Sequence, residues 1–338
     1  MNRKKVIKIL TATLCVLLAL ACGSCTWFFV RYNQIRSNPH SVINSNVDTQ
    51  INTDTGVELP TITYDGKEYY KNPNMVTLLF LGIDGYQERA SKNLGYRSDM
   101  IMICAIDTKK YKVTLISIPR DTKANITKMN QNGNITGSYV NKINAAFAGY
   151  SGKDLAYLNT VQTVENFINC DEQFDIDLSL YAGVDIDGIT DIADAVGGVQ
   201  VNLDMSLSGI GKKGQTVTLK GQDAIDYVRE RHGVGGDLKR AYRQQQFMLA
   251  LAKKIKQLGA RKSILALWDK VDGVVKTNLD TDQMLAFATI LEDVNLKGIA
   301  HVTIPTTGDS SSGKSYQIHD EEALEKIIID TFYIKKTE

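Results

Sequence analysis

The sequence has little of several features that would identify a class of protein directly. It contains five cysteines and four histidines in 338 residues, and its formal net charge is only +1. Five cysteines are too few for a disulfide-stabilised scaffold, and a chain without excess positive charge is not held to DNA by bulk electrostatics. Hydrophobic residues (43%) and charged residues (23%) occur in ordinary globular proportions. This composition excludes a disordered or a collagen-like chain.

Several catalytic signatures are also missing. The histidines are scattered and lack zinc-ligand spacing, and there is no G-x-S-x-G elbow and no internal repeat. One P-loop pattern is present, from Gly308 to Ser315. A P-loop needs a helix that begins at its Lys-Ser, whereas the helix signal here begins only near Asp320. We therefore interpret the segment as a Ser/Gly-rich loop.

The N-terminus carries a strong topology signal. Residues 1–31 hold five bases and no acid, which leaves 34 bases against 38 acids in the remainder, a net charge of −4. Residues 9–30 contain no charge, and 22 residues are enough for a helix to span a bilayer of about 30 Å. The flanking bases predict a cytoplasmic tail over residues 1–8 and a single-pass signal anchor over residues 9–30.

Two other N-terminal interpretations compete with the anchor. Ala19-Leu20-Ala21 resembles the cleavage site of a signal peptide. Cys22, which follows Ala21, suggests a lipoprotein whose lipid is attached to this cysteine. We favour the anchor, because the apolar run continues through Val30. In all three cases the rest of the chain lies outside the membrane.

The remaining chain divides into a stalk or linker over residues 31–56, rich in Asn, Ser, Thr and Asp, and a folded domain over residues 57–338. Alternating β-formers around Asp65-Gly66 predict a hairpin. Strands and helices alternate thereafter, which predicts one α/β or α+β domain with layered helices. The expected strands are 76–82, 100–106, 112–118, 174–181, 199–203, 227–231 and 299–304, and the expected helices are 141–150, 153–168, 185–196, 222–226, 237–258, 264–271, 281–293 and 320–333. Cys104 and Cys170 are either free thiols or a single disulfide.

Charged residues gather where three of these strands end or begin. The first strand ends at Asp84, Arg97 and Asp99 precede the second, and Arg120 and Asp121 follow the third. The second and third strands form a tight hairpin and are therefore antiparallel. We expect these five residues to share one sheet edge.

A second group of charged residues lies downstream. Arg229 and Arg231 are two apart, which places them on one face of the expected strand. Arg240, Arg243 and Gln244 share a face of the following helix, which Asp237 opens. Six of the eight arginines after residue 40 fall in these two groups. Arginine forks match phosphate oxygens, and paired acids can hold Mg²⁺, so the pattern indicates a phosphate or pyrophosphate site.

The order of these motifs resembles the LytR-CpsA-Psr family of bacterial cell-envelope proteins. The resemblance rests on seven segments: LFLGID (79–84), RSD (97–99), SIPRD (117–121), KINAAF (142–147), DAVGGVQVN (194–202), YVRER (227–231) and GGDLKRAYRQQ (235–245). It covers roughly residues 57–335. It implies a three-layer α/β/α sandwich around a mixed β-sheet, preceded by the single transmembrane helix.

The resemblance also implies an activity and a site. It implies a cell-membrane phosphotransferase, with its catalytic domain outside the cell, that moves a glycopolymer such as wall teichoic acid or capsular polysaccharide from a polyprenyl-pyrophosphate carrier to peptidoglycan. Asp84 and Asp99 would hold Mg²⁺ on the pyrophosphate. The implied catalytic residues are Arg97, Arg120, Arg229 and Arg231, and the implied substrate-binding residues are Asp237, Arg240, Arg243 and Gln244. Asp121 is counted with the catalytic residues because it is close in sequence, and it is either the general base or only a cap of its loop. No nucleic-acid partner is expected.

Three questions stay open from the sequence. The family often has an arginine two residues after the first aspartate, where this chain has Tyr86, and Arg89 is a possible replacement. The same site could serve a pyrophosphatase with water as acceptor. The third possibility is a membrane-anchored, non-enzymatic envelope regulator, since relatives have been labelled transcriptional attenuators.

Overall fold

The computed structural model describes residues 30–43, 61–84, 96–150, 153–230, 236–311 and 313–336. Its centre is a six-stranded sheet in the order β11-β8-β3-β4-β5-β12. These strands are β3 (Met75–Asp84), β4 (Arg97–Asp107), β5 (Lys112–Ser117), β8 (Tyr181–Asp185), β11 (Val275–Thr277) and β12 (Ala300–Thr303). The β3–β4 and β4–β5 pairs are antiparallel, whereas β3–β8 and β5–β12 are parallel. The predicted mixed sheet and the hairpin between its second and third strands are confirmed.

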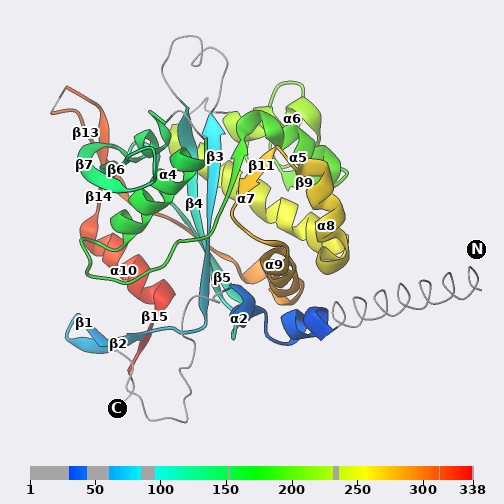
Figure 1. Ribbon diagram of the computed structural model, residues 1–338. Coiled ribbons are helices and arrows are strands. Elements are labelled where there is room, and N and C mark those ends of the chain that lie inside the picture. The colour runs from blue at the N-terminus through cyan, green and yellow to red at the C-terminus, as the bar shows by residue number, and fades with distance from the viewer. Residues whose placement is uncertain are drawn as a thin grey trace, which may run out of the picture.

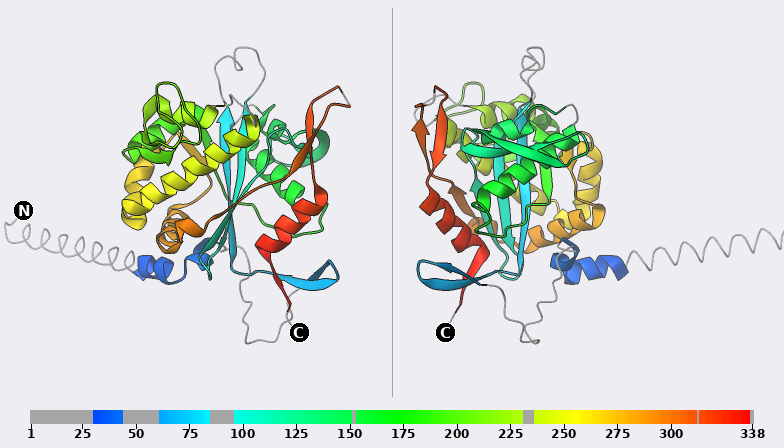
Figure 2. Two further views of the ribbon diagram at one scale, coloured as in Figure 1. Left: turned by 180° about the vertical axis from the view of Figure 1, so that it is seen from behind. Right: turned by 60° about the vertical axis from the view of Figure 1, so that its left-hand side comes forward.

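Helices cover both faces of this sheet (Figure 1). One face packs against α4 (Lys153–Ile168) and α10 (Glu321–Phe332). The other face packs against α9 (Thr281–Asp293), with α7 (Gly236–Gln257) and α8 (Ala260–Val271) on the same side (Figure 2). Because β3, β4 and β5 alternate apolar side chains between two separate cores, the sheet is buried on both faces. This arrangement is the three-layer sandwich that the family resemblance implied.

A third core forms a helical lobe beside the main sheet. Its elements are α5 (Ile189–Ala195), β9 (Val199–Asn202), β10 (Thr216–Leu219) and α6 (Gly221–Arg229), packed on α7. Phe247 and Leu251 on α7 belong to this core, whereas Met248 contacts the core beneath α9. Helix α7 therefore joins the lobe to the main sheet.

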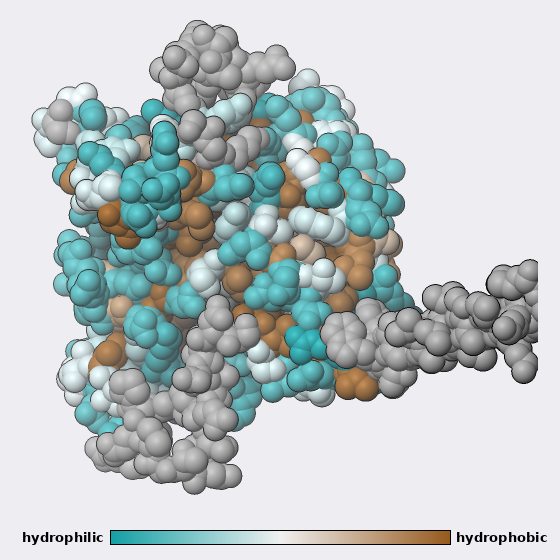
Figure 3. Space-filling view, in the orientation of Figure 1, coloured by the Kyte–Doolittle hydropathy of each residue, from teal (hydrophilic) through white to brown (hydrophobic). Residues whose placement is uncertain are grey.

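Smaller strands complete the fold. The predicted hairpin is confirmed as β1 (Thr61–Tyr64) and β2 (Lys67–Lys71), with Asp65 and Gly66 both at positive φ. Strand β15 (Tyr333–Lys335) pairs with β2. Two further hairpins, β6 (Lys123–Met129) with β7 (Ile135–Lys142) and β13 (Thr306–Asp309) with β14 (Tyr316–His319), had no counterpart in the sequence analysis. The face shown in Figure 3 is mainly hydrophilic, with hydrophobic patches between polar residues.

The first part of the predicted stalk differs from expectation. Residues 30–37 are helical, and a short helix α2 (Pro39–Ile43) follows. Ile35, Val42 and Ile43 are buried in the core beneath α9, and Arg31 Nε lies 2.8 Å from Asp282 Oδ2 on that helix. This part of the chain is therefore packed on the domain.

The N-terminal predictions lie largely outside the described residues. Residues 1–29 and 44–60 are not among them, so the predicted tail, nearly all of the predicted span and the second half of the predicted stalk have no structural counterpart here. No helix within the described ranges is both long and apolar enough to cross a membrane.

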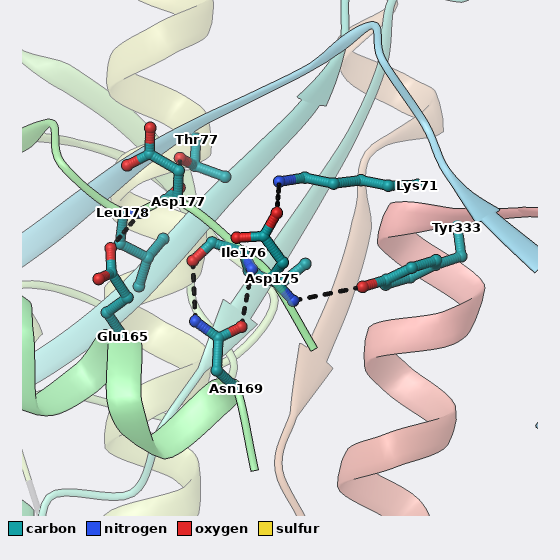
Figure 4. Close-up of polar contacts among 9 residues, drawn as sticks. All are labelled: Lys71, Thr77, Glu165, Asn169, Asp175, Ile176, Asp177, Leu178 and Tyr333. Atoms are coloured by element: carbon teal, nitrogen blue, oxygen red, sulfur yellow. Dashed lines mark hydrogen bonds and ion pairs between the residues drawn. The ribbon is translucent and has the colours of Figure 1, made fainter. Parts of the chain in front are cut away.

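The strand expected at 174–181 is wrong, because residues 175–180 form no strand. Figure 4 shows side chains that form hydrogen bonds with the backbone of this segment. Asn169 bonds both the N–H and the carbonyl of Ile176, Glu165 accepts from the N–H of Leu178, and Thr77 donates to the carbonyl of Asp177. Since these groups are already bonded, only β8, starting at Tyr181, joins the sheet.

Candidate functional site

A β-bulge shapes the sheet edge at which the first charged group meets. Asp84 at the end of β3 pairs in register with Arg97 at the start of β4. Gly82 pairs with Met100 and Ile83 with Ser98, so Asp99 is an extra residue without a partner on β3. Bulges of this kind redirect a side chain at a sheet edge. A Cβ on Gly82 would lie 2.9 Å from Cβ of Met100, so glycine permits this close pairing.

The tightest contact of the site joins β4 to the end of β5. Nη1 of Arg120 lies 2.5 Å from Oδ2 of Asp99, and both side chains are largely buried, at 18% and 6% exposure. The backbone at Arg120 is held by a turn between Pro119 and Thr122 and by the N–H of Asn144, which donates to the Arg120 carbonyl. A charge-assisted hydrogen bond between buried partners is strong and directional. The predicted meeting of Asp99 and Arg120 is thus observed.

A cavity of about 350 Å³ opens beside this ion pair. Its charged and amide-bearing lining residues are Asp99, Arg120, Asp121, Arg240, Gln244 and Gln317. Its remaining lining residues are Met100, Ile101, Ser117, Ile118, Pro119, Ala241, Thr303 and Thr306. The sheet edge, the N-terminal part of α7 and the β13–β14 hairpin therefore meet around one space.

Asp121 lines this cavity through contacts of its own. Its Oδ1 lies 3.2 Å from Nζ of Lys142 at the end of β7, and its backbone carbonyl accepts from the N–H of Gln317. Lys142 belongs to the KINAAF segment, for which the sequence indicated no role. The helix expected at 141–150 is observed only in part: β7 runs to Lys142, and a short 3-10 helix, Ile143–Phe147, follows.

Tyr139 on β7 is within electrostatic reach of Arg97. Burial raises the pKa of Tyr139, the neighbouring Tyr150 raises it further, and the positive charge of Arg97 acts in the opposite direction. Tyr139 therefore keeps its proton at neutral pH. Within the described part of the chain, the buried Nε of Arg97 has no hydrogen-bond acceptor.

The helical lobe supplies the second charged group. Nη2 of Arg229 lies 3.9 Å from Oδ1 of Asp84 and 3.2 Å from Oδ1 of Asp187. Arg240 and Gln244, one helical turn apart on α7, both line the cavity and are buried. The predicted shared face of Arg240 and Gln244 is therefore observed at the site.

The structure does not place the other three residues of the second group, Arg231, Asp237 and Arg243, at the cavity. The expected strand at 227–231 is wrong, because Tyr227, Val228 and Arg229 belong to α6, so the argument from alternating strand positions fails. Arg231 lies outside the described residues, and of the Asp237 side chain nothing is described. Arg243 has no exposed surface, lies 3.2 Å from Asp204 Oδ2 and does not line the cavity.

Several contributors had no clear sequence signal. Asp187 follows β8, and Thr303, Thr306 and Gln317 come from the C-terminal hairpin region. Gln245 beside the predicted Gln244 donates to Ser117 Oγ at 2.6 Å and so fixes α7 to β5. Only tertiary packing brings these segments to the sheet edge.

The P-loop interpretation is excluded by the local structure. Lys314 and Ser315 lead into strand β14, not into a helix, so no helix N-terminus faces a phosphate there. Cys104 and Cys170 are both free, and burial raises the pKa of Cys104 to about 12, which keeps this thiol protonated.

Asp84 and Asp99 are the carboxylates that the sequence predicted as magnesium ligands. No group of three His, Cys, Asp or Glu side chains suited to a metal occurs among the described residues. Mg²⁺ nevertheless often takes only one or two protein carboxylates and completes its shell with substrate phosphates and water. Asp84 and Asp99, at the facing ends of β3 and β4, supply oxygen ligands of the required kind. The donor set therefore fits a metal that arrives with a phosphorylated substrate.

Comparison with known proteins gives a consistent set of relatives. TagV of Bacillus subtilis, named polyisoprenyl-teichoic acid–peptidoglycan teichoic acid transferase, is 32% identical over 265 residues, which are 74% of this chain and 62% of TagV. TagU of Oceanobacillus iheyensis carries the same activity name and is 30% identical over 93% of this chain and 89% of its own length.

Solved structures support the same fold. The crystal structure of Bacillus subtilis TagV matches with a TM-score of 0.60 at 30% identity, over 75% of this chain and 94% of TagV. A structure described as TagT bound to LI-WTA matches with a TM-score of 0.57 at 23% identity, over 76% of this chain and 89% of that one. The LytR_cpsA_psr family profile matches residues 37–331. The chain therefore belongs to the LytR-CpsA-Psr family.

Proposed function

We propose that this protein is a membrane-anchored phosphotransferase that transfers a glycopolymer from a polyprenyl-pyrophosphate carrier to peptidoglycan. The glycopolymer would be wall teichoic acid or capsular polysaccharide. The observation that carries the proposal is the buried Asp99–Arg120 pair on the wall of a cavity that Arg240 and Gln244 also line. Such an array of fixed donors suits a pyrophosphate, and phosphoryl transfer depends mainly on charge neutralisation and alignment.

The reaction exchanges a phosphoanhydride bond of the pyrophosphate for a phosphodiester bond to the acceptor. A hydroxyl oxygen of the acceptor forms a bond to the phosphorus that carries the glycopolymer. The bond from this phosphorus to the bridging oxygen breaks, and polyprenyl phosphate leaves with the electron pair. The hydroxyl proton passes to Asp121, which lines the cavity and whose ion-pair partner is Lys142.

The arginines would neutralise the negative charge of the pyrophosphate. Arg97, Arg120 and Arg240 would donate to the pyrophosphate oxygens, and Arg229 would approach from the helical lobe beside Asp84. Asp84 and Asp99 would hold Mg²⁺, which when bound supplies further neutralisation of the phosphate charge. We expect chelation with EDTA to abolish transfer and added Mg²⁺ to restore it.

A product analysis tests the proposal. The full-length chain, in vesicles, is given a polyprenyl-pyrophosphate-linked glycopolymer with and without peptidoglycan, and label is followed into insoluble wall material. We expect transfer only when peptidoglycan is present, and no transfer by Arg120→Ala. Release of free glycopolymer phosphate at the same rate without peptidoglycan would instead identify a pyrophosphatase, and absence of both products would favour a non-enzymatic regulator.

The proposed topology has its own test. Protease added outside intact cells should degrade the domain, because the anchor would place it outside the cytoplasm. A fully protected domain, degraded only after lysis, would contradict the proposal.

A further inference from the structure

Arg243 is buried at a junction of three segments. Its side chain has no exposed surface. Nη1 lies 3.2 Å from Oδ2 of Asp204 and 3.5 Å from Sδ of Met205, both in the turn after β9, and Nη2 donates to the backbone carbonyl of Glu230. A guanidinium enclosed in this way cannot contact a substrate. It connects α7 to the β9 turn and to the end of α6.

The Glu230 carbonyl links Arg243 to the site. Glu230 is the C-cap of α6, and its N–H donates to the carbonyl of Asp226. Carbonyls at the C-terminus of a helix carry partial negative charge, which a guanidinium satisfies and stabilises. The preceding residue is Arg229, which faces Asp84 and Asp187. Arg240 lies one turn before Arg243 on α7 and lines the cavity. Arg243 therefore joins the helix end that carries Arg229 to the helix that carries Arg240.

The surroundings of this junction indicate that it is not a simple source of stability. Oδ1 of Asp204, Nε of Arg243 and Oη of the fully buried Tyr227 have no hydrogen-bond partners among the described residues. Burial and the charge of Asp204 raise the pKa of Tyr227, while Arg243 opposes the shift, so the three groups lie within electrostatic reach of one another. Buried ion pairs with unsatisfied neighbours stabilise a fold less than apolar packing would. What this pair does supply is a defined geometry between α6 and α7.

We propose that Asp204 and Arg243 are positioning residues, which hold the end of α6 against α7 so that Arg229 and Arg240 reach the substrate together. The inference rests on the proposed function, since it assigns these two residues a role in the same site. It predicts that the pair affects turnover through Arg229.

Conservative substitutions test this role. Arg243→Met keeps the unbranched apolar stem of the side chain and removes the donors, and Asp204→Asn keeps the volume and removes the charge. We expect each to lower the kcat of glycopolymer transfer by up to about tenfold, since a residue that acts by placing Arg229 can cost no more than the loss of Arg229 itself. Arg261→Met is the control, because it breaks an arginine–carboxylate ion pair outside the site, Arg261 with Glu292 at 2.5 Å, whose arginine is 25% exposed. We expect unchanged kcat in this control.

A double-mutant cycle separates positioning from a general loss of structure. If Arg243 acts through Arg229, then Arg243→Met should cost much less in an Arg229→Ala background than in the natural chain. The inference would be overturned if the fold-loss in kcat of the double variant equalled the product of the two single losses. It would also be overturned if Arg243→Met kept a normal kcat. If Arg243→Met does not fold, Asp204→Asn is used in the same cycle.

A readout that is independent of activity distinguishes the two proposals. Hydrogen exchange of the Glu230 amide, which is bonded to the Asp226 carbonyl, should quicken in Arg243→Met and remain slow in Arg261→Met. Unchanged exchange would overturn the positioning role. If the natural chain transfers no glycopolymer, the proposed function fails, and this exchange measurement still decides whether Arg243 holds the end of α6.

Discussion

The two halves of the candidate site are built in different ways. In the sheet-borne half, Asp99 and Arg120 are 2.5 Å apart and nearly buried. In the helix-borne half, Arg229 lies 3.9 Å from Asp84, and the two side chains are 29% and 21% exposed. The strands of the first half are fixed by ladders of backbone hydrogen bonds, with one bulge at Asp99. The helices of the second half are fixed by side-chain contacts such as Arg243 with Glu230 and Gln245 with Ser117.

This difference shows which interactions fix the positions of the side chains in each half of the site. The backbone ladder holds Asp84 and Arg97 before any substrate is present, and the bulge and the ion pair with Arg120 fix Asp99, whereas the lobe residues depend on the packing of α6 and α7. Pre-organised groups in a dry environment stabilise developing charge most effectively. We therefore expect the sheet-borne half to dominate catalysis and the helix-borne half to tolerate change better.

The largest expected effect is at Arg120. Arg120→Ala should lower transfer by on the order of 10²–10³-fold, as for the loss of one pre-organised donor. It also leaves the Asp99 carboxylate buried without its arginine, so the free energy of unfolding should fall by about 3–5 kcal/mol. Single-turnover transfer and urea unfolding measure the two effects. Near-normal transfer by Arg120→Ala would refute the assignment of the site, and Asp99→Asn, Arg120→Ala together should recover part of the lost stability.

A smaller effect is expected at Arg229. Its contact with Asp84 is longer and more exposed, so solvent and salt screen it. Arg229→Ala should lower transfer by on the order of tenfold, and the difference from the natural chain should shrink at high salt. Transfer rates at low and high ionic strength check this. A loss as large as that of Arg120→Ala would erase the distinction between the two halves.

The bulge at the sheet edge offers a third test. A methyl group at Gly82 would lie 2.9 Å from Cβ of Met100. We expect Gly82→Ala to destabilise the fold by about 1–3 kcal/mol through overpacking and to reduce transfer, because the strands that carry Asp84 and Asp99 must shift. Gly308→Ala is the control, since its nearest neighbour would be 3.9 Å away. Equal stability of the two variants would show that the bulge is not sterically fixed.

The smallest expected effect is a decrease in the free energy of unfolding at low pH, caused by His319 and His301. Burial lowers the pKa of His319, whose ring contacts Phe167, and of His301. The unfolded chain therefore binds protons more readily, and stability is lost as the pH falls below the ordinary histidine pKa of about 6.5. Urea unfolding at pH 7.5 and 5.5 should show this decrease, and His319→Gln should reduce it. A pH-independent unfolding free energy in the natural chain would contradict the expected linkage.

The sequence by itself determined the layered α/β fold and half of the site. Regular patterns within single segments predicted α4, α9 and the β1–β2 turn, whose Asp65-Gly66 pair requires positive φ. The ends of β3, β4 and β5 were also predictable, and these ends place Asp84, Arg97, Asp99 and Arg120 at one edge. In each case the deciding interactions are local or follow from a tight hairpin.

Only the tertiary structure decided the remainder. The segment at 227–229 became helical because Ala224, Tyr227 and Val228 pack into the core of the lobe, and a short apolar run does not distinguish strand from helix. Residues 175–180 left the sheet because distant side chains bond their backbone. Lys142, Gln317 and Asp204 joined the site or its support from segments far apart in the chain. Their partners are set by packing between elements, which no pattern within one segment records.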